Sequence, residues 1–191
     1  IGPLKQKVMV GVILDITELR RTEEQLRKSV RTDDLTGLHN RKALLERLDS
    51  ACQRANRHGV PFGILALDLD GFKAANDDFG HAAGDHVLKV IALRLQDHVR
   101  KTDYVARMGG DEFIILLEGF AGHEDRRVIA EKIVKAVASP IDLPCGGKVT
   151  IGVSIGVSAW TEDGSDCKHL MRAADAALYR AKAGGKGRVC Y

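Results

Sequence analysis

The feature that most constrains the fold is a pair of glycines next to an apolar run. Gly109 and Gly110 follow a partly apolar segment and precede two acids and the apolar run 114–117. Because glycine accepts the positive φ angles of tight two-residue turns, this pattern predicts a β-hairpin. The hairpin presents Asp111 and Glu112 beside a bare backbone, which can approach a phosphate or a cation. Gly-Gly turns flanked by charges are also common without any function.

Composition sets the class of protein. The 191 residues are 45% hydrophobic, enough for one core, so we expect a single domain with an extension. The 29 basic and 26 acidic residues leave a net charge of +3, which argues against nucleic acid as a partner. No run approaches the ~18–20 apolar residues of a membrane span, and no signal peptide is visible. We therefore expect a soluble, cytoplasmic protein with no membrane segment.

The cysteines carry little information about a site. They are scattered along the chain: Cys52, Cys145, Cys167 and Cys190. Because no pair has C-x-x-C spacing, a disulfide framework or a zinc site is not expected, and buried free thiols are predicted.

The N-terminal part carries two short patterns. Residues 8–14 form an apolar strand that is too short for a core, so we expect it to belong to an upstream domain. A helix is predicted over residues 17–30, with Thr17 as its cap. Its apolar positions form one stripe: Ile16, Leu19, Leu26 and Val30. The stripe fits a heptad seam except at Glu23, so a coiled coil and a plain linker helix both remain open.

From Thr32 onward the pattern is compact. Helical periodicity covers four segments, residues 40–55, 85–99, 125–138 and 166–183. Strands are predicted at 62–69 and 148–159 in addition to the hairpin, and a final strand begins within 188–191. This order predicts an α+β sandwich, in which helices flank a mainly antiparallel central sheet.

A second acidic cluster ends the strand predicted at 62–69. Asp68 and Asp70 are two residues apart, so their side chains point to the same side of the strand. Hard cations such as Mg²⁺ take oxygen ligands of this kind, although acidic strand ends exposed to solvent are also common. Gly71 and Lys73 add an open backbone and a positive charge, the parts from which phosphate sites are built.

Taken together, five ordered motifs resemble one family. They are Asp34-Leu35-Thr36-Gly37-Leu38-His39-Asn40-Arg41, Asp68-x-Asp70-x-Phe72-Lys73-x-x-Asn76-Asp77, Phe79-Gly80-His81-x-x-Gly84-Asp85, Arg107-x-Gly109-Gly110-Asp111-Glu112-Phe113 and Ala174-Asp175-x-Ala177-Leu178-Tyr179-x-Ala181-Lys182. Over residues 32–191 the chain resembles the GGDEF domains, diguanylate cyclases that condense two GTP into cyclic di-GMP. The resemblance implies a palm-like nucleotidyl-cyclase fold with a ferredoxin-like core.

The resemblance also implies the chemistry of the acidic clusters. Asp68, Asp111 and the Leu69 carbonyl would bind two divalent ions per active site, Mg²⁺ or Mn²⁺. Those ions would clamp the triphosphate for an in-line displacement. Glu112 would take the proton from the 3′-hydroxyl or help to position a metal, and Lys73 would neutralise charge on the transferring phosphates.

Guanine recognition follows from the same motifs. Asn76 and Asp85 stand at the family's guanine-reading positions and would supply acceptors for the N1–H and the exocyclic amine. Adenine would leave a buried carboxylate facing an acceptor nitrogen, which strongly disfavours it. Capping of a helix is the alternative role for Asp85. His81 is expected beside the nucleotide, with a supporting structural role as the alternative.

Two lysines and the two glycines complete the expected substrate site. Lys182 and Lys186 match the family's terminal phosphate contacts, and both also suit the negative end of a helix dipole. Gly109 and Gly110 leave room for GTP. The sequence departs from the family at Gly187, where Asn is frequent, and at His39, where Pro is frequent.

An inhibitory site is expected just before the hairpin. Arg100 and Asp103 match the family's Arg-x-x-Asp motif, where product dimers bind away from catalysis. Arginine can hold guanine edges or phosphates, and aspartate can accept from guanine. The alternative is an ordinary i,i+3 surface pair. A further arginine usually completes such a site, and the sequence does not choose between Arg126 and Arg127.

The resemblance predicts partners and domain boundaries as well. Each domain would bind one GTP, so activity requires a homodimer in which two half-sites meet. Residues 1–16 resemble the terminal strand of a truncated PAS domain, residues 17–31 a signalling helix, and residues 32–191 the cyclase domain. Two alternatives stay open: an idle domain that senses cyclic di-GMP or GTP, and a regulator of a linked phosphodiesterase module.

Overall fold

The computed structural model describes residues 31–119 and 122–191. The strand predicted at 8–14 and the helix predicted at 17–30 lie outside these residues. The elements in chain order are β1 (His39–Asn40), α2 (Arg41–His58), β2 (Phe62–Asp70), α3 (Phe72–Phe79), α4 (His81–Asp97), β3 (Tyr104–Gly109), β4 (Glu112–Glu118), α5 (His123–Val137), β5 (Ile141–Asp142), β6 (Lys148–Val149), β7 (Gly152–Ala159), α6 (Cys167–Ala183) and β8 (Val189–Cys190).

A six-stranded mixed sheet forms the centre of the fold. Its strand order is β1-β3-β4-β2-β7-β8, and β5 pairs separately with β6. The four long inner strands are antiparallel, whereas the two-residue edge strands β1 and β8 pair in parallel. The α+β prediction is confirmed, and its antiparallel sheet corresponds to the four inner strands.

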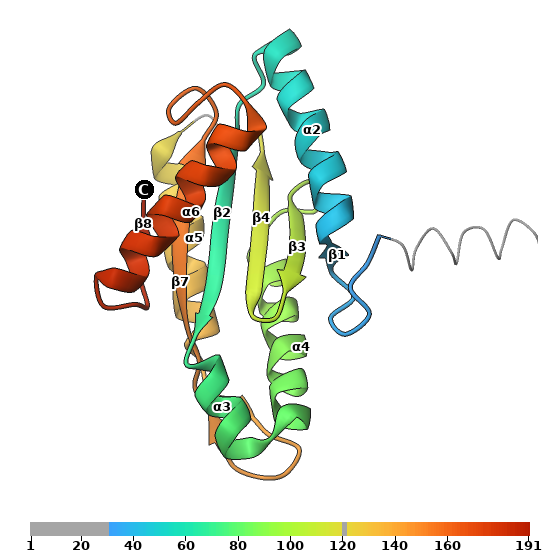
Figure 1. Cartoon of the computed structure of the whole chain (residues 1–191), viewed down its shortest axis with the longest axis vertical. Helices are drawn as coiled ribbons and strands as arrows, with labels where there is room; N and C mark the ends of the chain where they lie inside the picture. The colour runs from blue at the N-terminus through green and yellow to red at the C-terminus, as the bar shows by residue number, and fades with distance from the viewer. Residues whose placement is uncertain (1–30, 120–121) are drawn as a thin grey trace, which may run out of the picture.

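Helices cover both faces of the sheet (Figure 1). On one face α3, α4 and α5 pack on a core that includes Leu65, Leu67 and Leu69 of β2. On the other face α2 and α6 pack on Ile64 and Ala66, the alternate residues of the same strand. The central strand β2 is therefore buried on both sides except near its end, where Asp68 and Asp70 are half-buried.

Local signals explain where the helices begin and end. The side chain of Asn40 accepts from the Ala43 N–H and caps the start of α2, and Gly59, with φ of +65°, caps its end. Asp166 caps α6 by accepting from the His169 N–H. Both helices carry apolar residues on one side only, which is why periodicity located them to within a few residues.

Three local expectations need correction. The helix predicted at 85–99 begins at His81, so Asp85 lies inside α4 and does not cap it. The strand predicted at 148–159 is divided into β6 and β7. The helix α3 was not predicted, because only Phe72 and Ala75 of its eight residues are buried and no apolar period is visible.

The prediction of buried free thiols is wrong: two of the four cysteines form a disulfide, and the two free ones are exposed or half-buried. Cys52 of α2 and Cys167 of α6 form a disulfide, with their Cα atoms 6.3 Å apart. Cys145 and Cys190 are free. Spacing rules missed the bridge because its cysteines come together only through the packing of α2 and α6 on the sheet.

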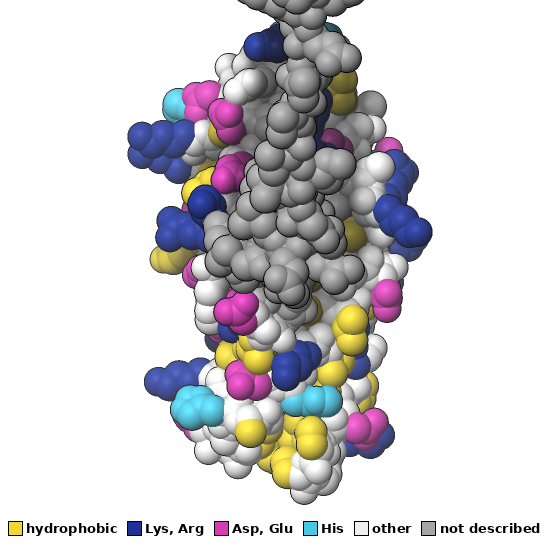
Figure 2. Space-filling view, turned by 90° about the vertical axis from the view of Figure 1, so that its right-hand side faces the viewer, with side chains coloured by type: hydrophobic (Ala, Val, Ile, Leu, Met, Phe, Trp, Pro, Cys, Tyr) yellow, Lys and Arg dark blue, Asp and Glu magenta, His cyan; other side chains and the backbone are white. Residues whose placement is uncertain are grey.

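Charged side chains of both signs are interspersed on the face seen in Figure 2, outside its grey atoms. Histidine and apolar side chains gather at the lower end of that view, where α3 and the start of α4 lie (Figures 1 and 2). In the part of the chain that the structure describes, no helix is both long and apolar enough to cross a membrane.

We expect Cys52→Ser to lower the free energy of unfolding by about 4–5 kcal/mol in non-reducing buffer, because the bridge joins residues 115 positions apart. Chemical denaturation measures the change, and most of it should disappear in the presence of a reductant. Cys145→Ser is the matched control, since it removes an exposed free thiol. Equal stability of Cys52→Ser and wild type without reductant would mean that both sulfurs are thiols.

Candidate active site

The hairpin turn consists of Gly110 and Asp111, one residue later than a Gly-Gly turn. Gly109 remains paired with Glu112, after a register irregularity that follows Arg107. Gly109 and Gly110 have φ of +141° and +53°, conformations that favour glycine. Arg107 Nε and Nη2 donate to the Gly110 carbonyl oxygen at 3.0 and 2.8 Å. The side chain of Arg107, in β3, therefore holds the turn that follows this strand.

The same guanidinium joins the turn to the loop before β1. Arg107 Nη1 donates to the two carboxylate oxygens of Asp33 at 3.0 and 3.2 Å. Thr36 donates to Asp33 from its backbone N–H and its hydroxyl at 2.9 and 2.6 Å. Burial acts to raise the pKa of Asp33, but the bonds from Thr36 and Arg107 outweigh it and lower that pKa. Asp33 is thus held in its charged form.

The hairpin turn lies against the end of β2 and places Asp111 and Glu112 next to Asp68. Asp68 is the register partner of Glu112, and the Leu69 N–H donates to the Asp111 carbonyl oxygen at 3.3 Å. Burial first, and then the charge of Asp68, raise the pKa of the Asp111 carboxyl. Lys182 Nζ lies 2.6 Å from Asp68 Oδ2 and brings a positive charge to the group.

This donor set suits a hard divalent cation. A cation would relieve the repulsion by which Asp68 raises the pKa of Asp111, and Mg²⁺ prefers oxygen ligands. Within residues 31–119 and 122–191, no three His, Cys, Asp or Glu side chains lie close enough to hold a metal alone. Backbone carbonyls, such as that of Leu69, and substrate phosphates would have to complete the coordination, as is common for Mg²⁺.

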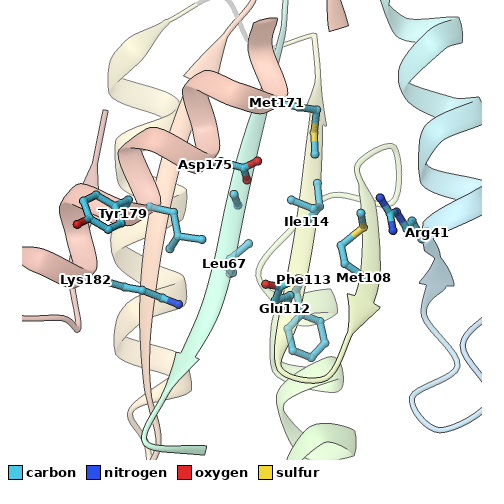
Figure 3. A pocket seen from close by; sticks show the side chains of 12 residues that line it. Arg41, Leu67, Met108, Glu112, Phe113, Ile114, Met171, Asp175, Tyr179 and Lys182 are labelled. Carbon is cyan, nitrogen blue, oxygen red and sulfur yellow. The ribbon is translucent and has the colours of Figure 1, made fainter. Parts of the chain in front are cut away.

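A pocket of about 440 Å³ opens beside Glu112, between α2 and α6 (Figure 3). Glu112 and Lys182 line one end of it, and Lys182 extends from α6 toward the sheet. Met171 lies at the other end, and Met108 and Arg41 lie on the side of the pocket toward β3 and the start of α2. Charged side chains around an apolar floor fit a ligand with a phosphate part and a less polar part.

The remaining predicted nucleotide contacts cluster at the corner between α3 and α4. Lys73 is exposed in the first turn of α3, and Asn76 lies half-buried one turn later. His81 begins α4, and Asp85 is exposed in its second turn. Asn76 packs directly on Gly84, since a Cβ atom built there would lie 1.8 Å from Asn76 Oδ1. The absence of a side chain at Gly84 thus lets Asn76 of α3 pack against α4, one residue before Asp85.

Lys182 and Lys186 lie at and just after the end of α6, as predicted. Lys182 is in the last turn of the helix, where a cation also suits the dipole. Lys186 is exposed in the loop that follows and has φ of +63°. Both the phosphate-binding interpretation and the helix-dipole interpretation therefore fit Lys182.

The Arg-x-x-Asp segment forms a tight turn between α4 and β3. The Arg100 N–H donates to Asp103 Oδ2 at 2.8 Å, and the Glu118 N–H donates to Asp103 Oδ1 at 3.2 Å. Burial raises the pKa of Asp103. Arg100 and Asp103 line a depression of about 270 Å³ together with Lys101 and His39. Asp103 thus has a structural role in the turn, and the surface beside it is hollowed.

Neither arginine suggested as a third member of that site lines the described hollows beside Arg100. Arg126 is buried and pairs with Glu162 at 2.6 Å. Arg127 pairs with two glutamates of its own helix, Glu124 and Glu131. The α5 cation that shares a hollow with Arg100 is Lys132.

A comparison with known families decides the relationship. Residues 30–188 match the family described as "Diguanylate cyclase, GGDEF domain". The chain belongs to the GGDEF family. In this GGDEF domain the signature of the family is the stretch from Gly109 to Phe113, which contains the turn held by Arg107.

Named relatives and solved structures agree with this assignment. The chain is 41% identical over 175 residues to the bifunctional diguanylate cyclase/cyclic di-GMP phosphodiesterase MucR of Pseudomonas aeruginosa, covering 92% of this chain and 25% of MucR. It is 41% identical over 155 residues to the diguanylate cyclase TpbB of the same species, covering 81% of this chain and 36% of TpbB. The chain therefore spans well under half the length of these curated relatives.

Among solved structures, the coiled coil and GGDEF domain of DgcB from Caulobacter crescentus, in complex with c-di-GMP, superposes with a TM-score of 0.86. Its sequence is 32% identical, and the match covers 92% of this chain and 93% of that one. The GGDEF domain of TpbB from Pseudomonas aeruginosa gives a TM-score of 0.80 at 40% identity, with coverage of 84% and 94%.

Sequence reasoning missed residues that hold this GGDEF site together. Arg107 belongs to one of the motifs, but its sequence indicates no role for it. Asp33 precedes the first motif by one position and is not part of it. Asp70 was considered only as an oxygen ligand, whereas its carboxylate accepts from Ser154 and Gly187. The sequence does offer one signal for the role of Arg107, which stands two residues before the glycine pair. A tight turn leaves backbone carbonyls that need hydrogen-bond donors, and a nearby arginine can supply them.

The contact between Gly84 and Asn76 leads to a test of the corner. Gly84→Ala should lower the free energy of unfolding by about 1–3 kcal/mol, because its Cβ displaces the Asn76 side chain. In an Asn76→Ala background the same change should instead stabilise the protein by about 0.5–1 kcal/mol, since alanine favours helices. Chemical denaturation of the four variants measures both effects. Destabilisation of equal size in both backgrounds would contradict the contact.

Proposed function

We propose that this GGDEF domain is a diguanylate cyclase that converts two GTP into cyclic di-GMP and two pyrophosphates. The proposal rests on the position of Asp68 next to Asp111 and Glu112 of the hairpin, and on the ion pair between Asp68 and Lys182. Degenerate domains would be expected to lack at least one of these groups, and this chain retains them all. Two relatives, TpbB and DgcP of Pseudomonas aeruginosa, are named diguanylate cyclases.

The acidic groups would act in separate roles. Asp68, Asp111 and the Leu69 carbonyl would hold Mg²⁺ or Mn²⁺, two ions per site, which when bound would neutralise the triphosphate and polarise its reacting oxygens. Glu112, which is exposed opposite Asp68, would accept the proton of the attacking 3′-hydroxyl. Lys73 and the two terminal lysines would bind phosphate oxygens.

Selectivity for guanine would come from the corner between α3 and α4. Asn76 and Asp85 supply acceptor oxygens for the N1–H and amine of guanine, and His81 stands at the start of the same helix. The packing of Asn76 on Gly84 supports this role, because it orients one reader before the nucleotide arrives.

The reaction requires two copies of the domain. Each 3′-hydroxyl attacks the α-phosphate of the opposite GTP, forms a 3′–5′ phosphodiester bond, loses its proton to Glu112 and releases pyrophosphate. One domain provides one set of these residues, so the two half-sites must face each other in a homodimer. The segments before the domain, residues 1–16 as the end of a PAS domain and residues 17–31 as a signalling helix, would control how often they meet.

A second function is favoured by relatives whose names include a phosphodiesterase activity. MucR is named bifunctional, and PdeR of Escherichia coli, 37% identical over 176 residues, is named a cyclic di-GMP phosphodiesterase. An idle GGDEF domain that senses GTP or cyclic di-GMP, or one that regulates a phosphodiesterase module, is therefore the alternative. Such a domain would bind the nucleotide without converting it, and the absence of product distinguishes it from a cyclase.

Incubation with GTP and Mg²⁺ should yield cyclic di-GMP, measured by chromatography. Glu112→Gln should reduce the rate at least about 100-fold, because proton removal is worth that much in related chemistry. Glu131→Gln is the matched control, since it neutralises an exposed acid of α5. The rate per molecule should fall on dilution. GTP binding without product at any protein concentration would favour the sensor.

We also propose that Arg100 and Asp103 bind the product and inhibit the enzyme. The hollow beside them supports a ligand there. Arg100→Ala should raise the cyclic di-GMP concentration for half-inhibition by about tenfold or more, because a charge-assisted contact is lost. Asp103 is a poor test position, since its carboxylate also accepts two backbone N–H groups. Lys148→Ala on β6 is the control, and unchanged inhibition in Arg100→Ala would contradict the site.

A further inference from the structure

The carboxylate of Asp70 has a defined set of partners away from the turn. Asp70 ends β2, and its side chain is on the same face of the strand as Asp68. Its two oxygens lie 3.0 and 2.9 Å from the hydroxyl of Ser154, which is buried in β7. Oδ2 also accepts from the Gly187 N–H at 3.0 Å. Asp70 therefore joins the sheet to the loop that follows α6.

That loop presents a lysine in an unusual conformation. Lys186 has φ of +63°, which side chains with a Cβ rarely adopt, and its neighbours Gly185 and Gly187 have φ of +114° and +57°. Such a residue persists only where its surroundings fix the backbone. The Lys186 N–H donates to the Ala181 carbonyl oxygen at 3.1 Å, which fixes one side of it. The bond from Gly187 to Asp70 fixes the other.

The two acids at the end of β2 thus hold one segment at two points. Asp68 pairs with Lys182 in the last turn of α6, and Asp70 accepts from Gly187 five residues later. Lys186 lies between these two anchors. Close approach of the strands supports the arrangement, because a Cβ atom at Gly152, the register partner of Asp70, would lie 3.2 Å from Asp70 Cβ.

We propose that Asp70 is a positioning residue, which holds the loop through Gly187 so that Lys186 contacts the triphosphate of GTP. The proposal rests on the proposed function, in which Lys186 binds phosphate. It assigns to Asp70 the role of a hydrogen-bond acceptor, in contrast to the metal ligand that its place beside Asp68 suggested. The lysine is the group that touches the substrate, and Asp70 acts through it.

Substitution of Asp70 by asparagine and by alanine separates the two roles. Asparagine keeps an oxygen that accepts from Gly187 and loses the charge that a metal needs, whereas alanine loses both. In titrations with GTP and with GMP, Asp70→Ala should weaken GTP binding about tenfold and GMP binding less than about twofold. Asp70→Asn should weaken GTP binding by no more than about threefold.

A double-mutant cycle tests whether Asp70 acts through Lys186. Lys186→Ala removes the amine and keeps a Cβ, so the backbone conformation of the loop is equally disfavoured. If Asp70 acts through the lysine, Asp70→Ala should change GTP affinity little once Lys186→Ala is present. Effects that multiply in the double variant would contradict the proposal, and so would an Asp70→Asn variant as weak as Asp70→Ala.

A measurement without nucleotide separates this inference from the proposed function. Hydrogen exchange of the Gly187 amide should be faster in Asp70→Ala than in wild type and little changed in Asp70→Asn. Ser154→Ala, which removes the other partner of Asp70, should also speed that exchange, and Ser158→Ala on the same strand should not. A wild-type protein that binds no GTP would contradict the proposed function. Unchanged exchange in Asp70→Ala would contradict the inference.

Discussion

The arrangement of the site depends on the guanidinium of Arg107. Its Nε and Nη2 bind the carbonyl oxygen of Gly110 inside the hairpin turn, and its Nη1 binds the charged carboxylate of Asp33. Arginine suits this task because its planar fork presents several donors in fixed directions. The turn therefore keeps one conformation, and Asp111 stays against the end of β2. Without this anchor, a two-residue turn rich in glycine would have many conformations available to it.

The central strand β2 provides the second half of the site. Hydrophobic residues bury both of its faces along most of its length, so its register against β4 and β7 is fixed. The acids lie near the end of the strand, where Asp68 pairs with Lys182 in the last turn of α6 and Asp70 accepts from Gly187 in the loop that follows. A rigid strand and an anchored turn thus bring carboxylates together from residues more than forty positions apart.

Much of this could be predicted from the sequence, and the remainder could not, for identifiable reasons. Helices with one apolar face, such as α2 and α6, were located because burial leaves a period in the sequence. The short helix α3 buries only two residues, so no apolar period marks it in the sequence. Motif spacing identified Asp68 and Asp111, but the roles of Asp33 and Asp70 arise from contacts between distant segments. The same applies to the pairing of Cys52 with Cys167, which depends on how two helices pack.

The most direct test of the account is the affinity of the GTP-bound domain for Mn²⁺, measured by electron paramagnetic resonance. Arg107→Ala keeps every carboxylate and removes only the anchor of the turn, and Arg127→Ala on α5 is its control. Arg107→Ala should weaken Mn²⁺ binding about tenfold, in the range found when groups that orient metal ligands are removed, and Arg127→Ala should not. Equal Mn²⁺ affinity in Arg107→Ala and wild type would contradict the role of Arg107 as the anchor of the turn.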